Sequence, residues 1–164
     1  MIGSWVRLKE KYPLEVASLF KSLLVCLDGS SYSERALATA LELARLSGAR
    51  ITLVTVVLGY KDAHVPVAPR LEQQTIQRAQ SYLQPFLDQG RGAGFEITGE
   101  VGHGDPAAEI LRIAAESHAD LIVMSTHRIG AEGRHALGSV ALKVLQASEC
   151  PVLMVRIPEA SVTT

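Results

Sequence analysis

The apolar residues of this chain occur in two patterns. Short runs with little polar interruption, such as Leu121-Ile122-Val123-Met124, are typical of strands that are covered on both faces of a parallel sheet. Between these runs, apolar residues recur at every third or fourth position, as in amphipathic helices. The runs predict five strands, over residues 21–27, 51–57, 95–101, 120–125 and 151–156. The third is the most polar, which places it near an edge of the sheet.

Four helical segments alternate with these strands. The first begins at Ser31, which has the spacing of a capping box with Glu34, and the second contains Pro85, which predicts a kink or a break. The third and fourth follow favourable N-cap residues, Asp105 and Ser139. This alternation predicts one α/β domain, a doubly wound five-stranded parallel sheet of order 3-2-1-4-5 and flavodoxin-like size.

Three segments differ from this pattern. Residues 1–20 place Trp5 and Leu8 among charges and are interpreted as an N-terminal appendage to a domain of residues 21–156, with residues 157–164 as a C-terminal tail. For the appendage, packing across the domain, an oligomer contact and a partly ordered terminus all remain open. Residues 59–70, with one glycine and two prolines, predict a long loop and a candidate lid.

Composition limits the classes of partner. The chain has 164 residues, 48% of them hydrophobic, which suits one domain with a substantial core. Its formal net charge of −1 provides no field that would attract nucleic acid or an anionic membrane. No apolar run approaches the ~18 residues of a membrane span and no signal sequence opens the chain, so a cytoplasmic location is expected. Cys26 and Cys150 are interpreted as reduced thiols rather than a disulfide.

The segment after residue 125 is the first candidate for chemistry. It follows the carboxyl end of a predicted central strand, where parallel sheets bind ligands, and it contains Gly130, Gly133 and Gly138 before the next helix. A glycine-rich backbone can approach a phosphate closely, and a helix N-terminus attracts negative charge. The pattern favours a phosphate-binding loop.

Five short motifs follow one another along residues 21–156. They are Leu27-Asp28-Gly29-Ser30, Gly104-Asp105-Pro106, Met124-Ser125-Thr126-His127, Gly138-Ser139-Val140 and Cys150-Pro151-Val152-Leu153-Met154-Val155. In this order and spacing they resemble the universal stress protein family of the UspA type. The resemblance implies a three-layer sandwich like that of the adenine nucleotide alpha hydrolases, a regulatory role in the stress response, and a homodimer formed through the last strand, Val152–Arg156. In one branch of the family it also implies an ATP or AMP site written Gly-x2-Gly-x9-Gly-(Ser/Thr).

The resemblance assigns this site position by position. Asp28 matches an acidic residue near the ribose and phosphates, and Val56 matches a position that lines the adenine pocket. The other matches lie on the pocket wall or in the phosphate-binding motif: Gly104, Met124, Ser125, His127, Arg128, Gly138, Ser139 and Val140. Ordinary structural roles are the alternatives, since Asp28 also suits a turn, Val56 a core and Gly138-Ser139 a helix start.

Two glycines of that motif are replaced, by Ser125 and Arg128, while the spacing to Gly138 is kept. Ser125 is a mild change because it still offers a backbone N–H and a hydroxyl. Arg128 has two opposite interpretations. It blocks the site if the backbone there requires a glycine conformation, or it binds the phosphates, whose geometry suits a guanidinium.

Two function classes follow. The histidines have neither the spacing nor the cysteine partners of a metal site, and the sequence contains no nucleophile elbow and no intact phosphate-binding loop with its lysine, so no metal ligand or catalytic residue is assigned. A non-enzymatic regulatory module is therefore favoured, with a magnesium ion expected only in association with a nucleotide. The alternative is a nucleotide-using enzyme with weak ATP hydrolysis or phosphoryl transfer.

Overall fold

The computed structural model describes residues 20–58, 69–126 and 137–156. The elements along these ranges are β1 (Ser22–Cys26), α2 (Ser31–Ser47), β2 (Arg50–Val57), α3 (Pro69–Gly92), β3 (Ile97–His103), α4 (Pro106–Glu116), β4 (Leu121–Thr126), α5 (Ser139–Ala147) and β5 (Val152–Arg156). The strands form one sheet of order β3-β2-β1-β4-β5, in which every neighbouring pair is parallel. The predicted α/β fold and its strand order are confirmed.

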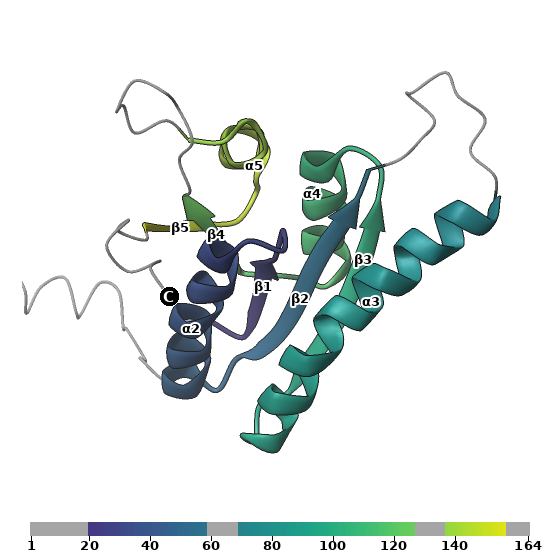
Figure 1. The fold of residues 1–164 in the computed structure, drawn as a ribbon. Helices are drawn as coiled ribbons and strands as arrows, with labels where there is room; N and C mark the ends of the chain where they lie inside the picture. Colours follow the sequence, from purple (N-terminus) through teal and green to yellow (C-terminus); the bar gives the residue numbers. More distant parts are fainter. Residues whose placement is uncertain (1–19, 59–68, 127–136, 157–164) are drawn as a thin grey trace, which may run out of the picture.

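The sheet separates two layers of helices, with α2 and α3 on one face and α4 and α5 on the other (Figure 1). Successive residues of β1 serve the two layers in turn. Leu23 and Val25 belong to the core under α2 and α3, Leu24 belongs to the core under α4 and α5, and all three are fully buried. A strand whose side chains are buried on both faces has no solvent-facing position, which explains the unbroken apolar run in the sequence.

The helix starts show where the predicted caps hold. Asp105 caps α4 as predicted, since its carboxylate accepts a hydrogen bond from the Ala108 N–H at 3.0 Å. The other two predictions were wrong by one residue. Ser30, not Ser31, caps α2, because the Asp28 carboxylate accepts from both the N–H and the hydroxyl of Ser30 and holds that residue in the turn before the helix. The N-cap of α5 is the extended residue Gly138, and Ser139 is the first helical residue.

The predicted interruption at Pro85 is absent as a break, because α3 continues through it as one helix. Proline removes one N–H from the helix, but Leu83 and Leu87 on either side of it are buried in the core and hold both turns in place. β3 lies at an edge of the sheet, as its polar pattern predicted. The predicted appendage, lid loop and tail fall almost entirely outside the described residues. None of the described helices is both long and apolar enough to cross a membrane.

Candidate functional site

A cavity of about 370 Å³ lies at the carboxyl ends of β1, β2 and β4, next to the first turns of α4 and α5. The topology places it there. The strand order reverses between β1 and β4, so the chain leaves β1 towards one face of the sheet and leaves β4 towards the other. Connections that diverge in this way leave a space beyond the strand ends, which is the usual ligand position in open α/β sheets.

The cavity brings together most of the described residues that the sequence assigned to a site. Seven of the predicted residues line it: Asp28, Val56, Met124, Ser125, Gly138, Ser139 and Val140. Gly104 does not line it, although its N–H donates to the carbonyl of Val57 at the end of β2. His127 and Arg128 lie outside the described residues, so their assignment stays a prediction.

Sequence reasoning missed eight further lining residues: Cys26, Leu27, Ser33, Val54, Thr55, Pro106, Ile110 and Ala141. Period-two alternation offered a signal for part of this set, because Val54 precedes Val56 by two residues and therefore shares its face of the sheet. Helical spacing offered another, since Pro106 and Ile110 are four residues apart on one face of α4. Both signals become useful only once one residue of each element is known to face the cavity.

The sheet side of the cavity is apolar. Val54, Val56 and Met124 belong to the core that α4 and α5 cover, and Cys26 joins them at 8% exposure. Burial, with a smaller effect of the nearby Asp28 carboxylate, raises the pKa of the Cys26 thiol above its usual range. The thiol is therefore neutral at physiological pH and behaves as a small apolar group. This wall suits a flat apolar ring.

The rim of the cavity near β1 is polar, and hydrogen bonds between Asp28 and Ser30 fix its conformation. Asp28 Oδ1 accepts from the Ser30 N–H at 2.9 Å and from the Ser30 hydroxyl at 2.6 Å. Gly29, between them, has φ of 81°, a conformation that favours glycine. The turn thus fixes an exposed carboxylate at the mouth of the cavity, where it can accept hydrogen bonds from hydroxyl groups of a ligand.

The rim near α5 offers backbone donors. Gly138 has no side chain with which to cap the helix, and among the described residues no side-chain cap hydrogen bond forms at this end. The first N–H groups of a helix, with the positive end of its dipole, attract anions. Because Ser139, Val140 and Ala141 line the cavity, this helix start faces the space that the apolar wall encloses.

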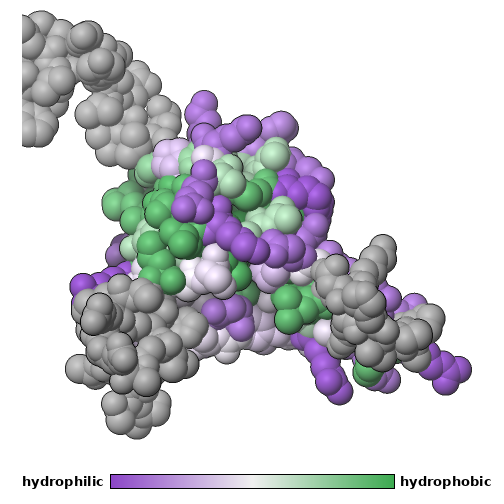
Figure 2. Space-filling model, turned by 90° about the horizontal axis from the view of Figure 1, so that it is seen from above, coloured by the Kyte–Doolittle hydropathy of each residue, from purple (hydrophilic) through white to green (hydrophobic). Residues whose placement is uncertain are grey.

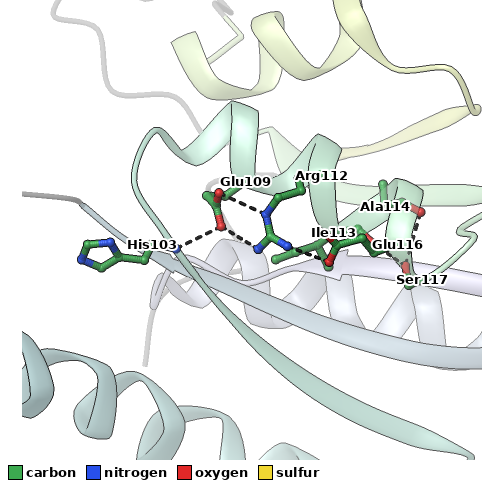
Figure 3. A network of polar contacts seen from close by, with 7 residues as sticks. All are labelled: His103, Glu109, Arg112, Ile113, Ala114, Glu116 and Ser117. Carbon is green, nitrogen blue, oxygen red and sulfur yellow. Dashed lines mark hydrogen bonds and ion pairs between the residues drawn. The ribbon is translucent and has the colours of Figure 1, made fainter.

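A network of polar contacts on α4 connects this helix to the end of β3 (Figure 3). Glu109 accepts from the N–H of His103 at 3.2 Å and is bound through both oxygens by Arg112, which also contacts Glu116 at 2.6 Å. The Arg112 hydrogen bonds, and then the His103 N–H, hold the pKa of Glu109 below its usual range. The His103 ring turns away from Glu109, and its Nε2 lies 3.0 Å from Glu72 of α3. The network positions α4, whose start borders the cavity.

In the part of the chain that the structure describes, no group of three or more histidine, cysteine, aspartate or glutamate side chains is arranged to hold a metal ion. The cavity offers three kinds of group to a ligand: an apolar wall for a ring, a carboxylate for hydroxyls, and helix N–H groups for an anion.

Known proteins share this architecture. Residues 19–156 match the model of a family described as the universal stress protein family. A universal stress protein from Thermus aquaticus is 35% identical over 144 residues, which span 84% of this chain and 100% of that protein. Hypothetical protein MJ0577 has a similar fold, with a TM-score of 0.75 and 24% identity over 86% of this chain and 99% of its own. A crystal structure of a universal stress protein in complex with cAMP has a TM-score of 0.66 and 26% identity, over 84% and 98% of the two chains.

Proposed function

This chain belongs to the universal stress protein family, and on that premise we propose that it is a regulatory module of the stress response that binds an adenine nucleotide, ATP or AMP, in the cavity beyond β1, β2 and β4. The observation that carries the proposal is the composition of that cavity. An apolar wall and a helix start without a side-chain cap lie within one space of about 370 Å³, at the lower end of the size range of small-molecule sites.

The residues divide among the parts of a nucleotide. Val56, Cys26 and Met124 form the apolar wall and contact the adenine ring. Asp28 accepts hydrogen bonds from the ribose hydroxyls. The N–H groups at the start of α5, with the Ser139 hydroxyl, hold the phosphate. Ser125 and Arg128 are the further phosphate-side residues that the motif assigns, and His127 is assigned to the pocket wall. Gly104 contributes only through its backbone contact to β2.

A relative supports the choice of nucleotide. The universal stress protein in complex with cAMP is 26% identical to this chain and covers 84% of it, so an adenine nucleotide is a ligand of a protein with this fold and related sequence. For the present chain the ligand is inferred from the cavity residues. The predicted cytoplasmic location stays a prediction.

The proposal is tested by calorimetric titration of the purified protein with ATP and AMP, combined with mass analysis of small molecules released on denaturation. We expect a bound adenine nucleotide, or saturable binding of at least one of the two. Val56→Phe should abolish binding because the larger ring fills the adenine side of the cavity, and Asp28→Asn should weaken it. Asp88→Asn is the matched control, since Asp88 is an exposed carboxylate on α3 that does not line the cavity.

The same samples separate the two function classes. A regulatory module retains intact nucleotide, whereas an enzyme releases ADP and phosphate at a rate that Asp28→Asn lowers. Failure of the wild-type protein to bind either nucleotide would show that the cavity has another role.

We further propose a homodimer formed through β5. This strand pairs only with β4 within the described sheet, and its residues Val152, Leu153, Met154 and Val155 are only partly buried. Two leucines of the preceding helix, Leu142 and Leu145, are 43% and 45% exposed. Seen from above, apolar surface gathers on the side of the molecule where α5 and β5 lie (Figure 2). An apolar edge strand is stabilised when the same strand of a second copy covers it.

A further inference from the structure

Two charged side chains join the N-cap of α4 to the second turn of α5. Lys143 Nζ lies 3.0 Å from Asp105 Oδ2, and the two side chains are 60% and 48% exposed. Asp105 directly precedes Pro106, and Lys143 lies one helical turn after Ser139; both of these neighbours line the cavity. Asp105 and Lys143 do not line the cavity themselves. The ion pair lies next to the lining residues that α4 and α5 contribute, outside the proposed nucleotide site.

The position of Lys143 gives its ammonium access to the start of α5. Long side chains in a helix lean back towards the N-terminus, so the lysine extends over the first turn rather than away from it. The flexible four-carbon stem lets the ammonium move between partners. A phosphate chain bound at the N–H groups of α5 comes within its reach.

Asp105 holds the lysine in the structure described here. Its Oδ1 accepts from the Ala108 N–H at 3.0 Å, and its Oδ2 faces Lys143. The Ala108 N–H and then the lysine keep the pKa of Asp105 below its usual range, so it is an anion at neutral pH. Exposed ion pairs of this kind contribute little to stability, because water competes for both partners. A ligand that carries several negative charges can therefore displace Asp105 from Lys143.

We propose that Lys143 is a specificity-determining contact that favours nucleoside polyphosphates over nucleoside monophosphates, by exchanging Asp105 for the outer phosphates. The inference rests on the proposed nucleotide site. A monophosphate is satisfied by the first N–H groups of α5. The second and third phosphates of ATP extend beyond them, bring the additional charge that attracts the lysine, and gain a charge-assisted contact there.

The experiment compares ATP with AMP by calorimetric titration of four variants and the wild-type protein. Lys143→Gln removes the charge and keeps most of the length; we expect it to weaken ATP binding about five- to tenfold and AMP binding less than about twofold. Lys143→Arg keeps the charge and should retain the ratio of ATP to AMP affinity. Asp105→Asn keeps the oxygen that caps α4 but removes the competing charge, so it should strengthen ATP binding. Lys21→Gln is the matched control, because Lys21 precedes β1 at the opposite end of the sheet.

The outcomes separate the inference from the function on which it rests. Equal loss of ATP and AMP affinity in Lys143→Gln, or no loss of either, overturns the inference and leaves nucleotide binding standing. Weaker ATP binding by Asp105→Asn overturns it as well, since the carboxylate would then be a required partner and not a competitor. If wild-type protein binds neither nucleotide, the proposed function fails and the inference fails with it. A circular dichroism spectrum and a melting curve of each variant test whether it is folded, so that a loss of affinity is not mistaken for unfolding.

Discussion

At the scale of single residues, two side chains of the same type contribute differently to stability when their hydrogen-bond partners and burial differ. Glu109 and Glu116 both lie on α4 and both bind Arg112, but only Glu109 also accepts the His103 N–H. The Glu109 side chain is 18% exposed, whereas that of Glu116 is 63% exposed. Because Glu109 links helix to strand and Glu116 does not, the two glutamates form a natural comparison.

Glu109→Gln should lower the melting temperature by about 2–5 °C at neutral pH, and Glu116→Gln by less. The pKa of Glu109 is lowered in the folded protein, chiefly by Arg112. Its contribution to stability is therefore fully present above the ordinary pKa of glutamate and is lost as the pH falls through the lowered folded pKa. Melting curves of wild type and Glu109→Gln between neutral pH and pH ~3 should converge on the acid side. A difference that does not change with pH would rule out the charge of Glu109 as its cause.

Arg128→Gly tests the residue that departs furthest from the phosphate-binding motif. We expect weaker ATP binding, by about tenfold or more, because a charge-assisted contact of about 1.5–3 kcal/mol is lost. This expectation follows from the spacing between Arg128 and Gly138, which is the spacing of the family motif. A sequence that no longer binds phosphate would have no reason to keep it. Titration with ATP and AMP reads the result. Tighter binding by the glycine variant would instead identify Arg128 as a blocking residue.

At the scale of elements, hydrogen bonds between helices replace some of the local pairs that the sequence suggests. Glu34 does not close a capping box on α2 with Ser31; its carboxylate accepts from the Tyr82 hydroxyl of α3 at 3.3 Å. Burial, and then the negative charge of Glu34, raises the pKa of Tyr82 to about 12. This contact ties together the two helices that cover one face of the sheet. The side-chain cap at the start of α2 is the Ser30 hydroxyl.

Ser30→Ala should destabilise the protein by about 1 kcal/mol, as expected for the loss of an N-cap. The hydroxyl accepts from the Ser33 N–H at 3.2 Å and donates to Asp28. Ser31→Ala is the matched control, because Ser31 is exposed in the first turn and does not cap the helix. Urea denaturation measures both. Equal effects of the two substitutions would contradict the assignment of the cap.

Two glycines near the end of α3 should respond differently to alanine. A Cβ on Gly90 would lie 3.0 Å from Cδ1 of Ile97, which is 3% exposed and packed in the core, whereas a Cβ on Gly92 would meet nothing within 4 Å. We expect Gly90→Ala to be less stable than Gly92→Ala by about 1–2 kcal/mol, because a buried isoleucine has little room to move. Denaturant midpoints of the two variants test this. A Gly90→Ala protein as stable as Gly92→Ala would show that β3 shifts freely against α3.

At the scale of the whole molecule, the apolar residues of β5, at one edge of the sheet, are only partly buried. The opposite edge, β3, has an exposed polar segment at residues 98–100. The β3 edge therefore exposes polar residues to water, whereas the β5 edge exposes apolar residues. A polar edge strand discourages pairing with another copy, whereas an apolar edge strand promotes it.

Sedimentation at micromolar concentration should show a dimer. Leu145→Lys should weaken it, because it places a charge on the apolar surface that continues from β5 onto α5. Leu46→Lys is the control, since Leu46 is 74% exposed on α2, on the other face of the sheet. A wild-type monomer at that concentration would refute the dimer, and equal effects of the two lysines would place the interface elsewhere.

The sequence by itself determined the strands, their order and seven of the fifteen residues that line the cavity. Burial on both faces of a strand leaves an unbroken apolar run, as in β1. A proline after a capping residue marks a helix start, as in Asp105-Pro106. Both signals come from residues that are adjacent in the sequence, so they can be recognised without the structure. The ordered motifs supplied the family and, through it, Asp28, Val56 and Ser139.

Only the tertiary structure decided what faces those residues. Ile110 and Ala141 reach the cavity because two helices from distant parts of the chain cover the same face of the sheet. The Asp105–Lys143 pair joins these two helices. Pro85 stays within a helix because the core holds both sides of it. Such contacts depend on how whole helices and strands pack against one another. They cannot be predicted from the spacing of residues along the chain.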